Sequence, residues 1–70
     1  MQRIAVASST IRAVGYDERN QALEVEFKSG GIYQYMNMPN SVYERFMAAS
    51  SKGKFLAQFI KDKYKTIKVR

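Results

Sequence analysis

Seventy residues allow one domain with a small hydrophobic core, because a chain of this length buries only about 60% of its unfolded surface. The apolar content of 46% is typical of a folded chain rather than a disordered one. The sequence has no cysteine and no histidine, which excludes disulfides, thiolate metal sites and the commonest neutral-pH general base.

The charge is distributed unevenly along the chain. Residues 1–44 carry four basic and five acidic side chains, a net of −1, whereas residues 45–70 carry eight basic side chains and Asp62, a net of +7. We therefore expect an anionic partner to approach the C-terminal part. The apolar run Ile4–Ala7 is shorter than the roughly 7–15 residues of a signal-peptide core. No run approaches the ~18 apolar residues of a membrane span, so we expect a cytoplasmic protein without membrane contact.

The first half of the chain predicts an antiparallel sheet. Ile11–Tyr16 is a strand whose apolar residues share one face if a bulge lies near Arg12–Ala13. Leu23–Lys28 alternates apolar and charged residues, which is the period of a half-buried strand. Ser29–Gly31 contains glycines that tolerate positive φ and should join this strand to Ile32–Met36 as a hairpin.

The second half predicts two helices. Pro39 ends strand pairing, and Ser41 with Glu44 predicts a capping box at the first helix start. Apolar residues at helical spacing follow in two groups, Val42, Tyr43, Phe46, Met47 and Ala49, then Phe55, Leu56, Phe59, Ile60 and Tyr64. Thr66–Arg70 alternates again, which indicates either a short edge strand or a frayed end. The expected fold is a single α+β domain over residues 1–70. It has a three-stranded antiparallel β-meander followed by two α-helices packed on one face of the sheet, and a short C-terminal strand is the optional last element.

Residues 8–64 contain a series of different short motifs, each occurring once. They are Ser8-Ser9 with Ile11, Val14-Gly15-Tyr16-Asp17, Leu23-x-Val25-x-Phe27-x-x-Gly30, Tyr33-x-Tyr35, Met38-Pro39-x-x-Val42-Tyr43, Ser51-x-Gly53-x-Phe55, and Ile60-Lys61 with Tyr64. This series resembles the KTSC domain, a short module at the C-terminus of some lysyl-tRNA synthetases and also a stand-alone bacterial or phage protein. The chain has Phe55-Leu56-Ala57 where the family has a Phe-Phe-Asn-like run. The resemblance implies no established activity, and it suggests RNA binding through the association with a tRNA-handling enzyme.

Two tyrosines of the third strand are candidate contacts to nucleic acid. Tyr33 and Tyr35 are two residues apart and therefore point to the same face of a strand. They form either a platform on which unpaired bases stack, each stack contributing ~1–3 kcal/mol, or a packing layer beneath the helices with the hydroxyl groups at the rim.

Basic residues supply the remaining candidates. Lys52, Gly53 and Lys54 begin the second helix, where free N–H groups and the positive end of the dipole favour a phosphate. The alternative for this stretch is a turn with an N-cap. Further along the chain, five basic side chains form either a track that contacts successive phosphates or a solvated face without a partner. They are Lys61, Lys63, Lys65, Lys68 and Arg70.

These patterns favour a non-enzymatic basic module that binds nucleic acid through phosphate contacts with low sequence specificity. The expected partner is RNA, with tRNA among the candidates. Glu24 and Glu26 share a strand face, but exposed carboxylates on a strand usually serve solubility. We therefore predict no catalytic residue, metal or cofactor. The alternative is a protein–protein interaction or self-associating accessory module whose charge keeps it in solution.

Overall fold

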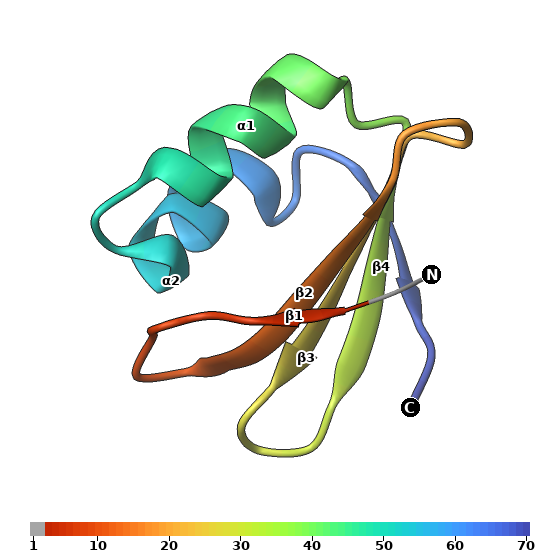
Figure 1. The fold of residues 1–70 in the computed structure, drawn as a ribbon. Helices are drawn as coiled ribbons and strands as arrows, with labels where there is room; N and C mark the ends of the chain where they lie inside the picture. The colour runs from red at the N-terminus through yellow and green to blue at the C-terminus, as the bar shows by residue number, and fades with distance from the viewer. Residues whose placement is uncertain (1–2) are drawn as a thin grey trace.

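A computed structural model describes residues 3–70 and shows a twisted sheet with the helices on one of its faces (Figure 1). The strands and helices in chain order are β1 (Ile4–Ala5), β2 (Ile11–Asp17), β3 (Ala22–Phe27), β4 (Ile32–Met36), α1 (Asn40–Ala48), α2 (Lys52–Phe55), the π-helical turn η1 (Leu56–Ile60) and β5 (Lys65–Lys68). Because α2 continues directly into η1, the two form one helical segment. The predicted α+β class, with an antiparallel sheet and two helical units, is confirmed.

The sheet is wider than the sequence predicts. Its five strands lie in the order β1-β2-β3-β4-β5, and each pairs with its neighbours antiparallel. The expected three-stranded meander is its centre, with one further strand at each edge. β1 pairs through Ile4 opposite Val14, in an N-terminal region to which the sequence analysis assigns no strand. At the C-terminus, β5 confirms the edge strand that was one of the two alternatives for Thr66–Arg70. Just beyond β5, Val69 N donates to Ile32 O at 2.7 Å.

The bulge expected near Arg12–Ala13 is confirmed. The register between β2 and β3 shifts between Ile11 and Ala13, so that Ile11 lies opposite Phe27 and Ala13 lies opposite Glu26. The extra residue turns both Ile11 and Val14 toward the helices, where both are fully buried.

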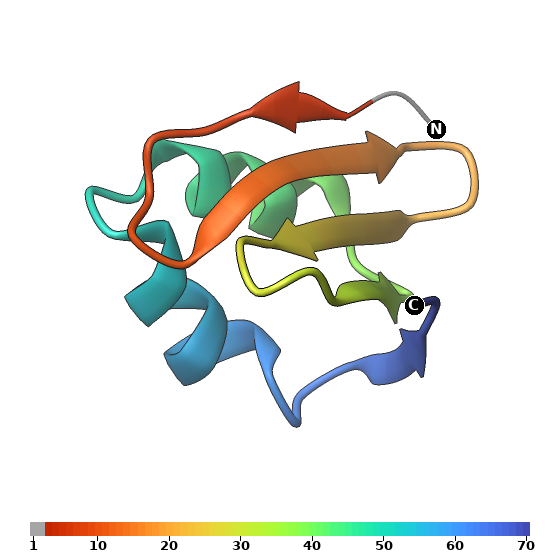
Figure 2. The same cartoon turned by 90° about the horizontal axis from the view of Figure 1, so that it is seen from below.

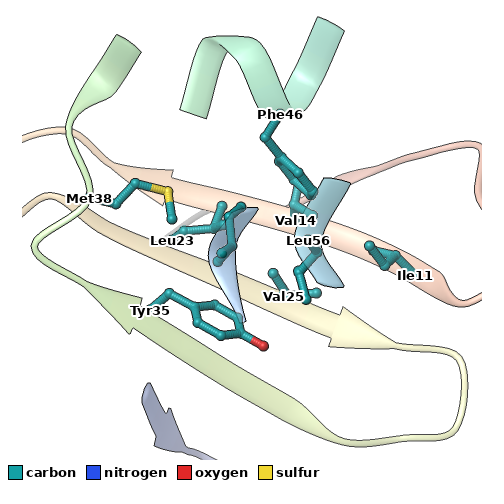
Figure 3. Close-up of a cluster of buried hydrophobic side chains, with 9 residues drawn as sticks. Ile11, Val14, Leu23, Val25, Tyr35, Met38, Phe46 and Leu56 are labelled. Atoms are coloured by element: carbon teal, nitrogen blue, oxygen red, sulfur yellow. The ribbon is translucent and has the colours of Figure 1, made fainter. Parts of the chain in front are cut away.

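The core lies between the sheet and the helices. Its buried members are Ile11, Val14, Leu23, Val25, Tyr35, Met38, Phe46, Leu56 and Ile60. Figure 3 shows Phe46 directed from α1 toward Val14, while Leu56 reaches the same cluster from the segment α2–η1. One aromatic ring from α1 and two aliphatic residues from α2–η1 therefore fix both helical units over the sheet.

The predicted capping box of α1 is wrong. The helix begins at Asn40 with Pro39 at the N-cap position, and no side chain caps it. Ser41 already lies inside the helix, so its hydroxyl group cannot act as the N-cap. Glu44 instead accepts a hydrogen bond from Asn40 Nδ2 at 3.3 Å.

The second helical segment also ends earlier than the apolar spacing predicts. Lys61 N donates to Leu56 O at 2.7 Å in the wide π-helical pattern. Asp62 then takes a positive φ of 66°, in the left-handed region that stops a helix. Tyr64 consequently lies beyond the helix, although its ring still packs against the core.

Candidate nucleic-acid interface

A cleft of about 570 Å³ opens between the segment α2–η1 and the strands β4 and β5. Figure 2 shows these elements from below, with the loop of residues 61–64 joining η1 to β5. The sheet side and its loops contribute Thr10, Phe27, Ser29, Tyr33, Tyr35 and Thr66, and the helical side contributes Gly53, Leu56, Ala57, Lys61 and Asp62. The volume lies within the ~300–1,000 Å³ range of small-molecule sites.

The two candidate tyrosines occupy different depths of this cleft. They lie opposite Val25 and Leu23 in the β3–β4 register and therefore face the helices. Tyr35 is 4% exposed and belongs to the core, so its ring is not an open stacking surface. Tyr33 is half-buried and meets Phe27 edge to face, with ring centroids 5.7 Å apart. Tyr33 is therefore the ring that a ligand can reach.

The environment keeps the Tyr35 hydroxyl group protonated. Burial raises the pKa of Tyr35 above its ordinary value, and the neighbouring Tyr33 and Asp62 raise it further. A neutral phenol both donates and accepts a hydrogen bond. At neutral pH the cleft therefore contains a hydrogen-bond donor at its buried end.

Gly53, in the first turn of α2, has a packing role. A Cβ atom at Gly53 would lie 2.9 Å from Thr10 Oγ1, so the missing side chain lets α2 approach the loop before β2. Ser8 Oγ fixes that loop by accepting hydrogen bonds from Thr10 N at 3.2 Å and Ile11 N at 3.1 Å. Ser51 caps the helix, since its Oγ accepts from Lys54 N at 3.3 Å. The turn and N-cap that we gave as the alternative are thus present.

The candidate lysines do not all lie at the cleft. Lys61 lines it, and Lys68 lies opposite Tyr33 on the same face of the sheet. Lys52 is half-buried, and its Nζ donates to Ala49 O at 3.4 Å. The exposed residues Lys54, Lys63 and Lys65 do not line the cleft, and Lys65 alternates to the opposite side of β5 from Lys68.

The structure therefore gathers Tyr33, Tyr35, Gly53 and Lys61 around one cleft, with Lys68 beside Tyr33. Sequence reasoning missed four polar residues that complete the lining, which are Thr10, Ser29, Asp62 and Thr66. They come from separate loops and an edge strand, and no local pattern marks them.

Acidic residues occupy the opposite face of the sheet. Glu24 and Glu26 alternate with the core residues of β3 and so point away from the helices. Arg3 lies 3.0 Å from Glu24, and Arg12 lies 3.8 Å from Glu26. The ion pairs found within residues 3–70 use none of the basic side chains of residues 45–70.

Comparison with known proteins identifies the family. The sequence model of the KTSC domain matches residues 7–64. The chain belongs to the KTSC domain family. An uncharacterised protein of Stutzerimonas stutzeri is 41% identical to it over 64 residues, which cover 91% of this chain and 90% of that protein. The fold agrees with the crystal structure of a KTSC domain protein from Yersinia pestis, with a TM-score of 0.95, 42% identity, and 99% and 97% of the two chains covered.

A lysine–tRNA ligase of Nostoc punctiforme contains a related segment. It is 42% identical to the KTSC chain over 57 residues, which cover 81% of this chain but 10% of the ligase. The chain thus corresponds to about one tenth of that relative. No helix among residues 3–70 combines the length and apolar composition needed to cross a membrane.

Proposed function

We propose that this KTSC domain is a non-enzymatic cytoplasmic module that binds nucleic acid, RNA in particular, through phosphate contacts. The observation that carries the proposal is the separation of charge across the sheet. The carboxylates of β3 are neutralised by arginines on one face, whereas Lys61 and Lys68 lie at or beside a cleft on the other. A cationic surface next to a concave aromatic site favours a polyanion that also carries rings.

The family relationship supports the same partner. Lysine–tRNA ligases, which by their name act on a tRNA, contain a segment related to this chain. Because that segment is about one tenth of each ligase, the relationship supports an RNA partner without transferring the ligase activity.

The mode of binding should be weakly specific. Phosphate contacts set the position of a protein on a strand but carry no base information. No helix or strand of the described residues presents a row of amide or guanidinium groups like those that read base edges. We therefore propose recognition of the backbone with low sequence specificity.

A salt titration tests the proposal. Binding of labelled single-stranded RNA is measured by fluorescence anisotropy across a range of salt concentrations. If about four phosphates are engaged, the log–log slope should be about −3, because each contact on a single strand contributes about −0.7. Lys61→Gln and Lys68→Gln should each make the slope shallower by about 0.7. The charge-matched control Arg19→Gln lies in the β2–β3 turn and should leave the slope unchanged. Absence of binding at the lowest salt concentration would refute the proposal.

A second candidate function rests on an exposed aromatic cluster. Phe59 is 45% exposed on η1, its ring centroid lies 4.9 Å from that of Phe55, and the Arg45 guanidinium lies 6.0 Å from the Phe59 ring. Aromatic and arginine side chains together are typical of protein-binding surfaces. Under this alternative the domain self-associates or binds a protein. Sedimentation should then show a mass that rises with concentration and falls back to the monomer in Phe59→Ser, whereas a monomer at all concentrations counts against self-association.

A further inference from the structure

The buried end of the cleft holds a hydroxyl group without a side-chain hydrogen bond to any of residues 3–70. Tyr35 is 4% exposed, and the side-chain hydrogen bonds of residues 3–70 do not use its hydroxyl group. No side-chain oxygen or nitrogen of the described residues is both sealed from water and unpartnered. The Tyr35 hydroxyl oxygen is therefore open to solvent, and Tyr35 is one of the residues that line the cleft. Figure 3 shows this oxygen on the side of the core cluster away from Phe46.

Tyr16 shows what a purely structural tyrosine looks like in this fold. Its hydroxyl group donates to Met38 O at 2.6 Å, so that its hydrogen-bonding capacity is used inside the protein. Both tyrosines pack with the core, yet only the hydrogen of Tyr16 has a protein acceptor among the described residues. The donor of Tyr35 is available to a molecule in the cleft.

The walls above this hydroxyl group suit a flat ring. Tyr33 and Phe27 form an aromatic surface on the sheet side, and Leu56 and Ala57 form an aliphatic surface on the helical side. A planar heterocycle between such surfaces gains stacking on one side and van der Waals contact on the other. A base stacked on an aromatic side chain is bound about 5- to 150-fold more tightly than one without it.

The mouth of the cleft supplies polar groups of both kinds. Lys61 donates, Asp62 accepts, and the hydroxyl groups of Thr10 and Ser29 do either, whereas the Thr66 hydroxyl group donates to Tyr64 O at 3.2 Å and is left to accept. Lys68 adds a second cation beside Tyr33. A ligand with a ring, hydroxyl groups and a phosphate on each side matches this set, and such a ligand is one nucleotide of a strand.

We propose that the cleft takes a single unpaired nucleotide of a bound strand. Its base lies between Tyr33 and the wall of Leu56 and Ala57, a base acceptor meets the Tyr35 hydroxyl group, and the flanking phosphates lie toward Lys61 and Lys68. This inference rests on the proposed function, because the cationic surface delivers the strand. It adds a preference for single strands, since a base within a duplex cannot leave its stack without an energetic cost.

The test compares four labelled ligands by anisotropy: a short oligoadenylate, a short oligouridylate, an abasic strand of the same length and an RNA duplex. The wild-type domain should bind the two base-containing strands at least about 5-fold more tightly than the abasic strand. Ala57→Leu fills the cleft and should reduce that preference to about 1-fold, with binding of the duplex unchanged. Gln58→Leu, which places the same side chain on the next residue outside the lining, should retain the preference.

Tyr35→Phe removes the donor and keeps the ring. It should weaken binding of the base-containing strands by about 2- to 13-fold and leave the abasic strand unaffected. An amide chemical-shift map of the wild-type domain provides a measurement that needs no variant. Base-containing strands should shift the amides of Tyr35, Ala57 and Thr66, and the duplex should not.

The outcomes separate the two proposals. If no nucleic acid binds at low salt, the proposed function itself fails. If strands, abasic strand and duplex bind equally and Ala57→Leu changes nothing, the cleft proposal is overturned while phosphate binding stands. If AMP or UMP shifts the cleft amides but the oligonucleotides do not, the cleft is a site for a free nucleotide, and the strand proposal is overturned.

Discussion

Replacement of Gly53 by alanine tests whether close packing explains this glycine. The added Cβ would lie 2.9 Å from Thr10 Oγ1, closer than such atoms normally approach. Forcing an extra methyl group into a packed contact costs ~1–3 kcal/mol. Alanine in a helix recovers about 1 kcal/mol relative to glycine. The two effects oppose each other, so Gly53→Ala should lower the free energy of unfolding by about 0–2 kcal/mol.

Thr10→Ala removes the obstructing atom and reverses the sign. The side chain of Thr10 makes none of the hydrogen bonds found within residues 3–70, so its removal breaks none of them. In that background Gly53→Ala should raise the free energy of unfolding by up to about 1 kcal/mol, because the helix propensity acts alone.

Urea unfolding of the wild type, the two single variants and the double variant measures this interaction directly. The coupling energy between the two positions should be about 1–3 kcal/mol. Additivity within about 0.5 kcal/mol would refute the packing explanation. A Gly53→Ala variant of unchanged stability that lost RNA binding would instead favour a phosphate seat at this turn.

Four further variants test local interactions by urea unfolding. Ser51→Ala should cost about 1 kcal/mol because its Oγ caps α2, whereas Ser41→Ala, inside α1, should stay within about 0.5 kcal/mol of the wild type; equal effects would contradict the assigned helix starts. Burial, followed by the negative charges of Glu18 and Asp17, raises the pKa of Tyr16 in the folded protein. The Tyr16 hydroxyl group therefore contributes fully to the free energy of unfolding below pH about 10, and this contribution is lost as pH rises through the folded pKa. Tyr16→Phe should cost about 0.5–1.5 kcal/mol at neutral pH, and it should flatten the decline above pH about 10. The hydrogen bonds from Asn20, above all from its side chain, lower the pKa of Asp17 in the folded protein. The Asp17 carboxylate therefore contributes to the free energy of unfolding above pH about 4, and this contribution is lost as pH falls through the folded pKa. Asp17→Asn should destabilise at neutral pH, with a difference that shrinks below pH about 4; a difference independent of pH would contradict this reasoning.

The central strands are predictable because their information is local. The alternation over Leu23–Lys28 and the glycine turn before Ile32 define two strands without knowledge of the rest of the fold. The bulge also follows from the sequence, since Ile11 and Val14 cannot share a face without an extra residue.

The features that escaped prediction depend on distant partners. β1 has two residues, too few to show a period, and it exists through its pairing with Val14 and Ala13. The apolar spacing that carried the second helix on to Tyr64 gives no sign that the helix widens into a π-turn and stops before Asp62. Residue type was enough to select Tyr33 and Lys61 as candidates.

The other side of the cleft could not be selected in this way. Thr10 reaches the cleft because the loop before β2 packs against Gly53, and Thr66 reaches it because β5 pairs with β4. The packing of the loop on Gly53 has no sequence signature of its own, and the alternation over Thr66–Arg70 indicates an edge strand or a frayed end without showing which strand it would pair with.

β5 gives the cleft a wall of low local stability. All four of its residues are exposed, and a single neighbouring strand, β4, holds it in place. Edge segments with little buried surface open at a small fraction of the global unfolding free energy. Thr66 therefore belongs to a wall whose local opening costs less free energy than opening of the core beneath it. An occupant that contacts Thr66 should stabilise this strand against opening and slow the hydrogen exchange of its amides.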